Sequence, residues 1–558
     1  MTAAIQQTYD RWLQRADPSL REELRAMDGR QREDAFYREL AFGTGGLRGL
    51  IGAGTNRMNV HTVARASQGL ADYVKKRAGE MRRVAVSCDS RILSDVFART
   101  AAGVFAANGI EALIYPQLMP TPCLSYAVRA LGCAAGVMVT ASHNPAGYNG
   151  YKVYGPDGCQ ITTEAAAEIL GEIEKLDVFD GVAQMDFHAG IASGLIRHIP
   201  DSVYTDYVEA VKKESLLGEE AVDRSAAIVY TPLNGAGLRP VLRVLAESGY
   251  SHVTVVPEQE KPDGRFPTCP SPNPELPEAM ALGLQYAEKR RADLLIATDP
   301  DCDRCGIAVR DDRGAFRLLT GNETGVLLLD YVCRRRAALG RMPENPVVVK
   351  TIVTTDLAEA VAAHYGAEVV NVLTGFKFIG ETIGRLEDRG ERDRYIFGFE
   401  ESCGYLSGTY VRDKDAVNAA LLIAEMFCWY RQQGISLLSR LDSLYRAYGY
   451  SLSTLHSYVF EGSAGFGRMQ SIMAAFRSGV GTLAGRAVEV CRDYAPGIDG
   501  LPAADVLKFR LSGGASVVVR PSGTEPKLKA YITVTAPREE EARRQEKALA
   551  DALAAFMG

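Results

Sequence analysis

The sequence has no excess of basic residues and no long apolar run. Its 63 lysines and arginines are outnumbered by 69 acidic residues, and the formal net charge is −6. Nothing in that balance attracts nucleic acid or an anionic membrane surface. No apolar stretch reaches the length of a membrane-spanning helix, and the first residues, MTAAIQQTYDRWLQ, lack the basic and apolar segments of a secretion signal. We expect a cytoplasmic protein whose partners include neither nucleic acid nor membrane.

Disulfides and structural zinc are not expected either. Eleven cysteines, an odd number, are scattered without a framework through the chain. That pattern is typical of buried free thiols in a reducing compartment. Cys302 and Cys305 form one C-x-x-C pair, but no second pair and no histidine cluster accompanies it. The pair therefore gives little support for a zinc or redox site.

Nucleotide-binding motifs are also missing. The chain contains no G-x-x-x-x-G-K-[ST] sequence, which argues against a nucleoside triphosphatase. The glycine-rich segment 42–59, FGTGGLRGLIGAGTNRMN, fails as a dinucleotide fingerprint because Arg48 stands where the third glycine belongs. Arg48 and Arg57 are instead predicted to lie in flexible chain from which they can reach an anion.

The chain does contain a repeated alternation of apolar strands and amphipathic helices. With 558 residues it is too long for a single core, and the alternation is typical of βαβ units with a mainly parallel sheet. Candidate strands of three successive blocks lie at 84–88, 112–115, 134–140, 226–232, 252–258, 293–299, 346–355, 367–375 and 395–401. A last block has candidate strands near 505–511, 516–520 and 529–535, followed by a helix over 537–557.

The predicted fold class is therefore α/β. Three similar mixed α/β domains are expected over 1–203, 204–320 and 321–449, followed by a C-terminal α+β domain over 450–558. Every loop with notable chemistry follows a predicted strand. Because open α/β sheets place ligand sites at the carboxyl ends of their strands, the four blocks could direct four loops toward one central cleft.

The segment 134–152, AAGVMVTASHNPAGYNGYK, carries the candidate nucleophile. An apolar strand ends at Thr140 and releases Ser142 between a small residue and His143, which is how a sheet presents a reactive hydroxyl. Lys152 can supply the positive charge that a phosphoryl group on Ser142 needs. An ordinary Asn-Pro turn is the structural alternative. A Ser/His hydrolase is disfavoured, because no G-x-S-x-G motif surrounds the serine.

Three aspartates alternate in ATDPDCDRCG, residues 297–306. Side chains repeat every second residue in extended backbone, so Asp299, Asp301 and Asp303 can face one side. Three neighbouring carboxylates repel each other unless a cation joins them, and oxygen ligands at a phosphate-handling site favour Mg²⁺. An EF-hand is excluded because arginine stands at the sixth and twelfth positions of the loop. A solvated acidic turn is the remaining alternative.

Two later loops carry groups suited to a sugar phosphate. The loop 397–405, FGFEESCGY, presents Glu400 and Ser402, whose oxygens can bond the hydroxyls of a polyol, although paired glutamates are also common on solvated surfaces. The loop 517–531, VVVRPSGTEPKLKAY, gathers donors for an anion, with a polar hairpin turn as the alternative. Its candidate phosphate contacts are Arg520, Ser522, Gly523, Thr524 and Lys527.

In chain order, GTGGLRG, TASHNP, DPDCDR, GFEES and RPSGTEP resemble the motifs of the α-D-phosphohexomutases, the phosphoglucomutase and phosphomannomutase family. LTGFKFIGE (373–381) and YVRDKDAV (410–417) are similar to the longer phosphoglucomutase/phosphopentomutase branch. The resemblance covers nearly the whole chain and implies four domains around a central cleft. One departure is Cys302, where the family usually has alanine or glycine; we expect its side chain to point away from the metal.

The resemblance also implies roles for individual residues. Ser142 is expected to be the phosphoserine, and one of its phosphoryl oxygens is expected to complete the Mg²⁺ site of Asp299, Asp301 and Asp303. The groups expected around the transferring phosphoryl, for proton transfer or charge stabilisation, are His143, Lys152, Arg48 and Arg304. The sugar hydroxyls are expected to meet Glu400 and Ser402. The clamp on the non-transferring phosphate is expected to be Arg520, Ser522, Gly523 and Thr524.

The implied activity is intramolecular phosphoryl transfer between glucose 1-phosphate and glucose 6-phosphate, through a phosphoserine and a sugar 1,6-bisphosphate. Mannose or pentose phosphates are alternative substrates, because the sequence does not show which hydroxyls GFEES contacts. A bisphosphate synthase or phosphatase that uses Ser142 is a further variant. A non-catalytic sugar-phosphate sensor is the alternative from another class. It is disfavoured because every expected chemical position is filled.

Overall fold

The computed structural model describes residues 2–43, 45–77, 79, 82–460, 462–522 and 527–557. The chain divides into two compact units. The first runs to Leu319 and includes Gly380–Arg392 and Gly404–Cys428, and the second comprises Thr320–Ile379, Asp393–Cys403 and the chain from Trp429 onward. Among the described residues, no helix combines the length and the apolar character needed to cross a bilayer.

Three helices open the first unit: α1 (Ala3–Arg15), α2 (Pro18–Ala26) and α3 (Gly29–Phe36). α1 ends three residues before Pro18, which begins α2 and is a residue type suited to the first helical position. Trp12 and Phe36 pack with Phe179 in a small apolar core. That core attaches these helices to the α/β domain that follows.

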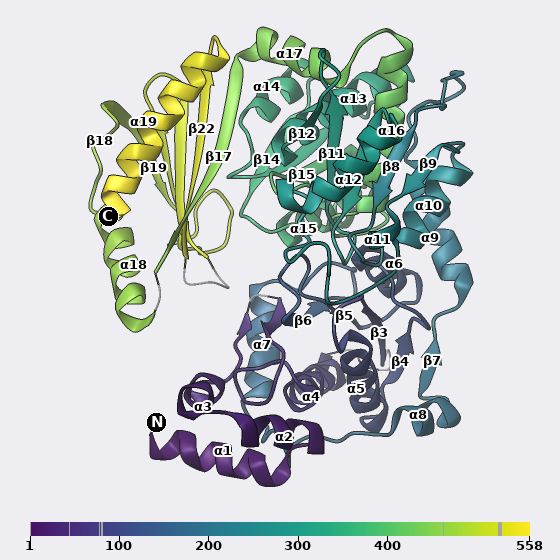
Figure 1. Cartoon of the computed structure of the whole chain (residues 1–558), viewed down its shortest axis with the longest axis vertical. Helices are drawn as coiled ribbons and strands as arrows, with labels where there is room; N and C mark the ends of the chain where they lie inside the picture. The colour runs from purple at the N-terminus through teal and green to yellow at the C-terminus, as the bar shows by residue number, and fades with distance from the viewer. Residues whose placement is uncertain are drawn as a thin grey trace. The chain divides into compact units, whose positions relative to one another are not determined.

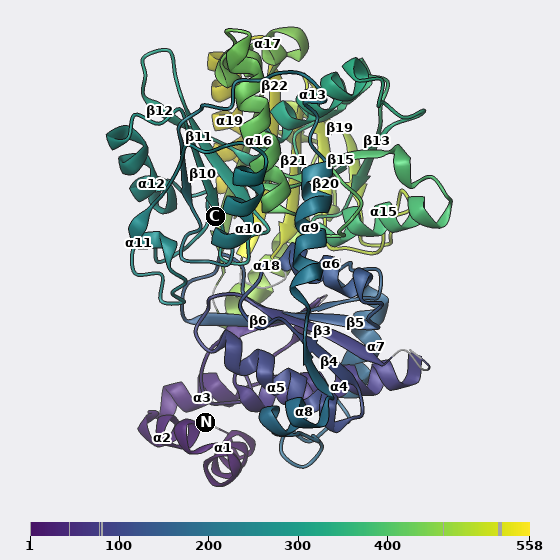
Figure 2. The same cartoon turned by 90° about the vertical axis from the view of Figure 1, so that its right-hand side faces the viewer.

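The first large sheet has the strand order β1-β2-β6-β5-β3-β4-β7. Its strands are β1 (Phe42–Gly43), β2 (Gly46–Leu50), β3 (Arg83–Cys88), β4 (Glu111–Ile114), β5 (Ala135–Val139), β6 (Tyr148–Tyr154) and β7 (Ile196–His198). Figure 2 shows β3, β4 and β5 side by side; they pair in parallel as predicted, whereas β2 and β6 are antiparallel additions. The helices of this part are α4 (Val60–Arg77), α5 (Ser94–Ala107), α6 (Thr121–Ala130), α7 (Thr163–Ile173), α8 (Phe187–Ser193) and α9 (Asp201–Lys213).

The glycine-rich segment differs from the prediction. Arg48 lies on β2, which pairs with β6 along its whole length, and not in flexible chain. The guanidinium of Arg57 is bound to the carboxylate of Asp34 and to the backbone oxygen of Asn56. The charge of Arg57 is thus paired within the fold, and its contact with an anion stays a prediction.

The second sheet of the first unit has the order β12-β11-β10-β8-β9. Its strands are β8 (Ile228–Thr231), β9 (Val253–Val255), β10 (Leu294–Thr298), β11 (Cys305–Arg310) and β12 (Phe316–Leu319), and its helices are α10 (Leu238–Glu247), α11 (Pro257–Glu260) and α12 (Pro277–Lys289). The first three of these strands are parallel and the last two antiparallel. The connection from β10 to β11 carries the three aspartates.

The second unit begins with a parallel arrangement β14-β13-β15, formed by β13 (Val347–Thr351), β14 (Glu368–Val372) and β15 (Tyr395–Glu400). The strand predicted over 346–355 is shorter than expected, because the chain turns after Thr351, whose carbonyl accepts a hydrogen bond from the N–H of Thr354. The other elements of residues 321–448 are α13 (Gly321–Ala338), α14 (Leu357–His364), α15 (Lys377–Asp388), η1 (Arg392–Arg394), β16 (Gly404–Leu406), α16 (Ala416–Gln432) and α17 (Leu437–Tyr448).

The C-terminal part is an antiparallel sheet in the order β17-β22-β21-β20-β19-β18. Its strands are β17 (Tyr450–Val459), β18 (Thr482–Leu483), β19 (Arg486–Asp493), β20 (Leu507–Leu511), β21 (Ala515–Pro521) and β22 (Lys527–Ala536), with helices α18 (Gly462–Arg477) and α19 (Glu539–Met557). Apolar side chains of the helices and of the sheet share one core, and α19 lies along the sheet in Figure 1. The α+β character predicted for this domain is confirmed.

Candidate active site

Ser142 lies in the loop between β5 and β6, at the carboxyl end of a parallel strand. Its side chain is almost entirely buried, and its backbone has a φ of 52°, a left-handed conformation that is uncommon for a residue with a side chain. The N–H of Ser142 donates to the hydroxyl of Thr140 at 2.8 Å. The loop thus holds the serine in one defined conformation.

The hydroxyl of Ser142 faces two candidate partners. Its Oγ donates to Oδ2 of Asp299 at 2.9 Å and lies 3.2 Å from Nδ1 of His143. The structure therefore brings the candidate nucleophile to the acidic loop of another sheet. Burial, followed by the nearby arginines, lowers the pKa of His143 well below its ordinary value, so the ring is neutral at neutral pH.

The three aspartates converge, but not for the reason that the sequence suggested. Ligand oxygens of Asp299, Asp301 and Asp303 lie within 4.8 Å of one another and are buried. The loop is curled, not extended: Cys302 has a φ of 52°, and the N–H groups of Asp303 and Arg304 donate to Oδ1 of Asp299 at 3.1 and 3.0 Å. The chain wraps around the first carboxylate and so turns all three inward.

Cys302 points away from the triad, as expected. Its Sγ lies against Gly237 at the start of α10, so closely that a Cβ on that glycine would be 2.8 Å from the sulfur. Burial raises the pKa of the thiols of both Cys302 and Cys305 well above the ordinary value. These thiols are free and buried, which matches the prediction.

The triad fits a hard divalent cation. The Oδ1 atoms of Asp301 and Asp303 are buried and accept no hydrogen bond from any described residue. Burial together with the two neighbouring carboxylates raises the pKa of Asp299 well above its usual value. Clustered carboxylate oxygens with vacant lone pairs match the ligand preference of Mg²⁺.

Two lysines supply positive charge to the triad. Nζ of Lys152, on β6, lies 2.7 Å from Oδ2 of Asp301 and 3.4 Å from Oδ2 of Asp303. Nζ of Lys414 lies 3.1 Å from the same oxygen of Asp303. Burial opposes ionisation of Asp301, but the ammonium of Lys152 outweighs it and holds the pKa of that carboxyl below its usual range. Lys414 was not among the predicted site residues; its signal was the basic residue between acids in RDKDA.

The two predicted arginines border this site. Nη1 of Arg48 donates to Oδ1 of Asn144 at 3.4 Å, within the serine loop. Nη1 of Arg304 pairs with Glu275 at 2.7 Å, and its Nε lies 4.0 Å from Oδ2 of Asp299. Both guanidinium groups therefore lie beside the charged side chains that surround Ser142.

The remaining predicted residues belong to the second unit. Glu400 ends β15 and is buried, and its Oε1 accepts a hydrogen bond from the N–H of Gly375 at 2.9 Å. Ser402 lies in the turn that follows and is half-buried. This placement at a strand end matches the predicted position of the loop, while contact with a sugar stays a prediction.

The anion loop is described in part. Arg520 lies near the end of β21, where its Nη2 donates to the hydroxyl of Tyr531 at 3.4 Å. The N–H of Ser522 donates to the carbonyl of Lys527, the first residue of β22, at 2.8 Å. Gly523 and Thr524 lie outside the described residues.

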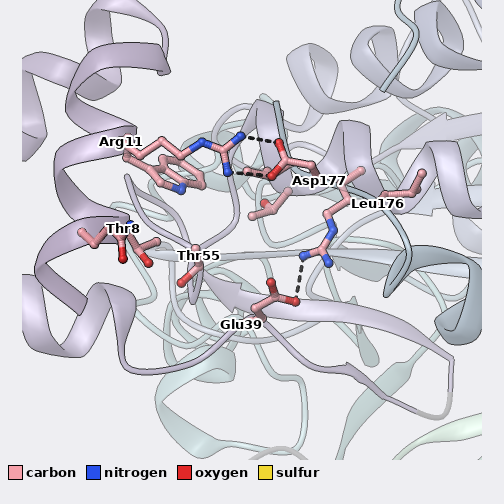
Figure 3. A pocket seen from close by; sticks show the side chains of 11 residues that line it. Thr8, Arg11, Glu39, Thr55, Leu176 and Asp177 are labelled. Atoms are coloured by element: carbon pink, nitrogen blue, oxygen red, sulfur yellow. Dashed lines mark hydrogen bonds and ion pairs between the residues drawn. The ribbon is translucent and has the colours of Figure 1, made fainter. Parts of the chain in front are cut away.

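A cavity of about 310 Å³ lies in the first unit, where α1 meets the chain around residue 177 (Figure 3). Arg11 forms a two-pronged ion pair with Asp177, with distances of 2.6 and 2.7 Å, and Arg65 pairs with Glu39 at 2.7 Å. The Arg11–Asp177 pair attaches α1 to the domain, and the Arg65–Glu39 pair joins α4 to the segment before β1.

Comparison with known proteins defines the class. Models of the phosphoglucomutase/phosphomannomutase family match the chain as alpha/beta/alpha domain I at 39–178, domain II at 205–314, domain III at 320–448 and the C-terminal domain at 483–552. The chain belongs to this family, and the resemblance seen in its motifs is confirmed.

The chain is also similar to a named enzyme of this family. The phosphoglucomutase of Staphylococcus saprophyticus is 35% identical over 551 residues, which cover 96% of this chain and 98% of the relative. A family protein from Burkholderia thailandensis has a similar fold, with a TM-score of 0.68 at 18% identity over 92% and 97% of the two chains. N-acetylphosphoglucosamine mutase of Aspergillus fumigatus, solved with GlcNAc-6P and magnesium, shares the fold at a TM-score of 0.51 and 14% identity, with both chains fully covered.

Proposed function

We propose that this protein is a Mg²⁺-dependent phosphoglucomutase that interconverts glucose 1-phosphate and glucose 6-phosphate through a phosphoserine at Ser142 and a sugar 1,6-bisphosphate. The observation that carries the proposal is the 2.9 Å hydrogen bond from Ser142 to Asp299 of the buried triad. The phosphoglucomutase relative, at 35% identity over almost the full chain, supports glucose phosphates as the substrates. Mannose and pentose phosphates are the alternatives.

Phosphoryl transfer requires positioning and neutralised charge more than covalent machinery. Ser142 would carry the phosphoryl group, and Lys152 and Lys414, already within 3.1 Å of the triad, would offset its negative charge. His143 is neutral and 3.2 Å from the hydroxyl, so it can hold the proton that Oγ exchanges. Arg48 would bind the phosphoryl oxygens from the edge of the site.

Asp299, Asp301 and Asp303 would hold Mg²⁺, and an oxygen of phosphorylated Ser142 would complete the site. When bound, the ion stabilises the negative charge of the phosphoryl group during transfer. The magnesium complex of the Aspergillus mutase supports this choice of metal. Arg304 would lie beside the same phosphoryl.

The sugar phosphate would be recognised by residues of the second unit. Glu400 and Ser402 would bond the sugar hydroxyls. The non-transferring phosphate would be bound by Arg520, Ser522, Gly523, Thr524 and Lys527. The domain boundaries, the shared cleft and the cytoplasmic location stay predictions.

The proposal is tested by intact mass spectrometry before and after incubation with glucose 1,6-bisphosphate, followed by turnover assays on glucose, mannose and pentose phosphates. We expect one phosphoryl group per chain, located at Ser142, and the highest kcat/KM on glucose 1-phosphate. A protein that gains no phosphoryl group under these conditions and shows no mutase turnover would overturn the proposal. A higher kcat/KM on another sugar phosphate would identify that sugar phosphate as the preferred substrate and would leave the proposed mechanism unchanged.

A further inference from the structure

Arg91 lies against the loop that carries Ser142. It follows β3, and its side chain has no exposed surface. Its Nε and Nη2 both donate to the carbonyl oxygen of Ser142, with a distance of 3.2 Å from Nε. Nη2 also donates to the carbonyl of Asn144, and Nη1 donates to those of Pro145 and Tyr148 at 3.0 Å each.

These bonds use the whole guanidinium. An arginine side chain has five N–H donors; here Nε makes one bond and each terminal nitrogen makes two, all to backbone carbonyls of one loop. The ring of Phe266 lies 5.1 Å from Cζ and covers the group. Arg91 therefore has no donor left for a phosphoryl oxygen.

Asp89 secures the other side of Ser142. Its carboxylate accepts hydrogen bonds from the hydroxyls of Thr140 at 2.6 Å and Ser94 at 2.9 Å. The same threonine oxygen accepts the N–H of Ser142 at 2.8 Å. Both backbone groups of Ser142 are thus held, one directly by Arg91 and one through Thr140 by Asp89.

We propose that Arg91 and Asp89 are positioning residues for phosphoryl transfer, which hold the left-handed backbone of Ser142 so that its Oγ meets the metal triad. The inference deepens the proposed function and rests on it. An uncommon backbone conformation persists where its surroundings determine it. At Ser142 the carbonyl is bound by Arg91, and the N–H is bound by Thr140, whose hydroxyl donates to Asp89. The two residues do not touch the reacting atoms.

Lysine cannot replace this arginine. Its single ammonium carries three donors at one point and cannot reach carbonyls spread from residue 142 to residue 148. Loss of those bonds would let the serine loop adopt other conformations. Because a misplacement of about 1 Å can cost about 100-fold in rate, Arg91→Lys should lower kcat by about 10- to 100-fold. The KM for glucose 1-phosphate should stay within about twofold, since the proposed sugar contacts lie on other loops.

The experiment compares Arg91→Lys with Arg310→Lys. Arg310 is a matched control: it also donates to backbone carbonyls, those of Ala292 and Gly314, and lies over an aromatic ring 4.3 Å away, but at the far end of β11. Intact mass after incubation with glucose 1,6-bisphosphate gives the fraction of chains that can be phosphorylated. The kcat and KM are then expressed per phosphorylatable chain, so that a loss of folded protein does not count as a loss of positioning.

The expected result is a reduced kcat per phosphorylatable chain and an unchanged KM for Arg91→Lys, with wild-type values for Arg310→Lys. A kcat for Arg91→Lys within about twofold of wild type, or a KM that rises in step with the fall of kcat, would overturn the inference. If Arg91→Lys does not fold, Asp89→Asn, which keeps the shape of the side chain, tests the inference through its kcat per phosphorylatable chain and its KM. Failure of the proposed function itself looks different, because wild type and Arg310→Lys would then take up no phosphoryl group.

Discussion

The hydroxyl of Ser142 donates a hydrogen bond of 2.9 Å to the carboxylate of Asp299, although 157 positions of the chain separate the two residues. One follows a parallel strand of the first sheet and the other follows a parallel strand of the second. This hydrogen bond joins the nucleophile directly to a carboxylate of the metal triad. A substitution at Ser142 should therefore affect the triad, and a substitution in the triad should affect Ser142.

Ser142→Ala removes the hydroxyl that would carry the phosphoryl group. Turnover should fall by at least about 10³-fold, and incubation with glucose 1,6-bisphosphate should add no mass. The melting temperature should change little, because the substitution removes one oxygen. Ser193→Ala, at an exposed position of α8, is the control and should keep both turnover and phosphorylation. Wild-type activity in Ser142→Ala would rule out this nucleophile.

Asp301→Asn removes one negative charge from the triad. The Mg²⁺ concentration for half-maximal activity should rise by at least about 10-fold, because the remaining carboxylates attract the cation less strongly. The measurement is a Mg²⁺ titration of turnover. Asp312→Asn, at an exposed position beyond β11, is the matched control. An unaltered metal response in Asp301→Asn would count against the triad as the metal site.

Lys414→Ala should separate metal binding from catalysis. The ammonium lies 3.1 Å from Asp303 and repels a cation at the triad. Its removal should tighten Mg²⁺ binding, measured by calorimetry, while kcat falls because the phosphoryl charge is less well neutralised. Lys175→Ala, on the surface of the same unit, should change neither quantity. Weaker Mg²⁺ binding in Lys414→Ala would contradict this account.

His61 should make the stability of the first unit depend on pH. Burial lowers the pKa of its ring against the opposing effect of Asp17, whose carboxylate is 3.6 Å away. The neutral ring accepts the backbone N–H of Asp17 at Nε2, and protonation would remove that acceptor. A lowered folded-state pKa contributes stability above the ordinary pKa of about 6.5, and this stability is lost as the pH falls through the folded value.

The melting temperature should therefore drop between about pH 7.5 and about pH 5.5 by more in wild type than in His61→Phe. The phenyl ring keeps the contacts with Trp12 and Phe179, which lie 5.5 and 5.0 Å from the imidazole. His188→Asn, at an exposed position, should behave as wild type does. Equal pH dependence in wild type and His61→Phe would refute the assignment.

Arg520→Ala should weaken binding of the sugar phosphate. Its Nε is buried and donates to no described residue. Loss of charge-assisted bonds should raise KM by about 10- to 100-fold, with a smaller effect on kcat. Arg510→Ala, at an exposed position of the adjacent β20, is the control. A KM equal to that of wild type would remove Arg520 from the phosphate clamp.

Local patterns predicted most of the strands near the site. Residues 134–140 and 293–299 form β5 and β10 within a residue or two, because parallel strands buried on both faces consist of continuous apolar runs. The antiparallel β6 was missed: YNGYKVY mixes polar and apolar residues and follows a turn. Lys152 was nevertheless identified, since its motif did not depend on its secondary structure.

The support around the nucleophile could not be predicted in the same way. Arg91 and Asp89 stand in an unremarked segment, CDSR, and their importance depends on bonds to a loop more than fifty residues further along the chain. Lys414 likewise meets Asp303 from a distant segment. No periodicity or local motif encodes such contacts, because they form only when segments that are distant in sequence lie side by side in the fold.

The amino-acid sequence by itself determined which reactive groups this protein has. They are a hydroxyl after a buried strand, three alternating carboxylates and glycine-containing loops with donors for an anion. Those features are local, since each depends on neighbours within a few residues. The tertiary structure decided which of them meet, placing Ser142 on Asp299 and four carbonyls of its loop on Arg91. Hydrogen bonds over such separations exist only once the strands that carry them are packed, and so they belong to the fold.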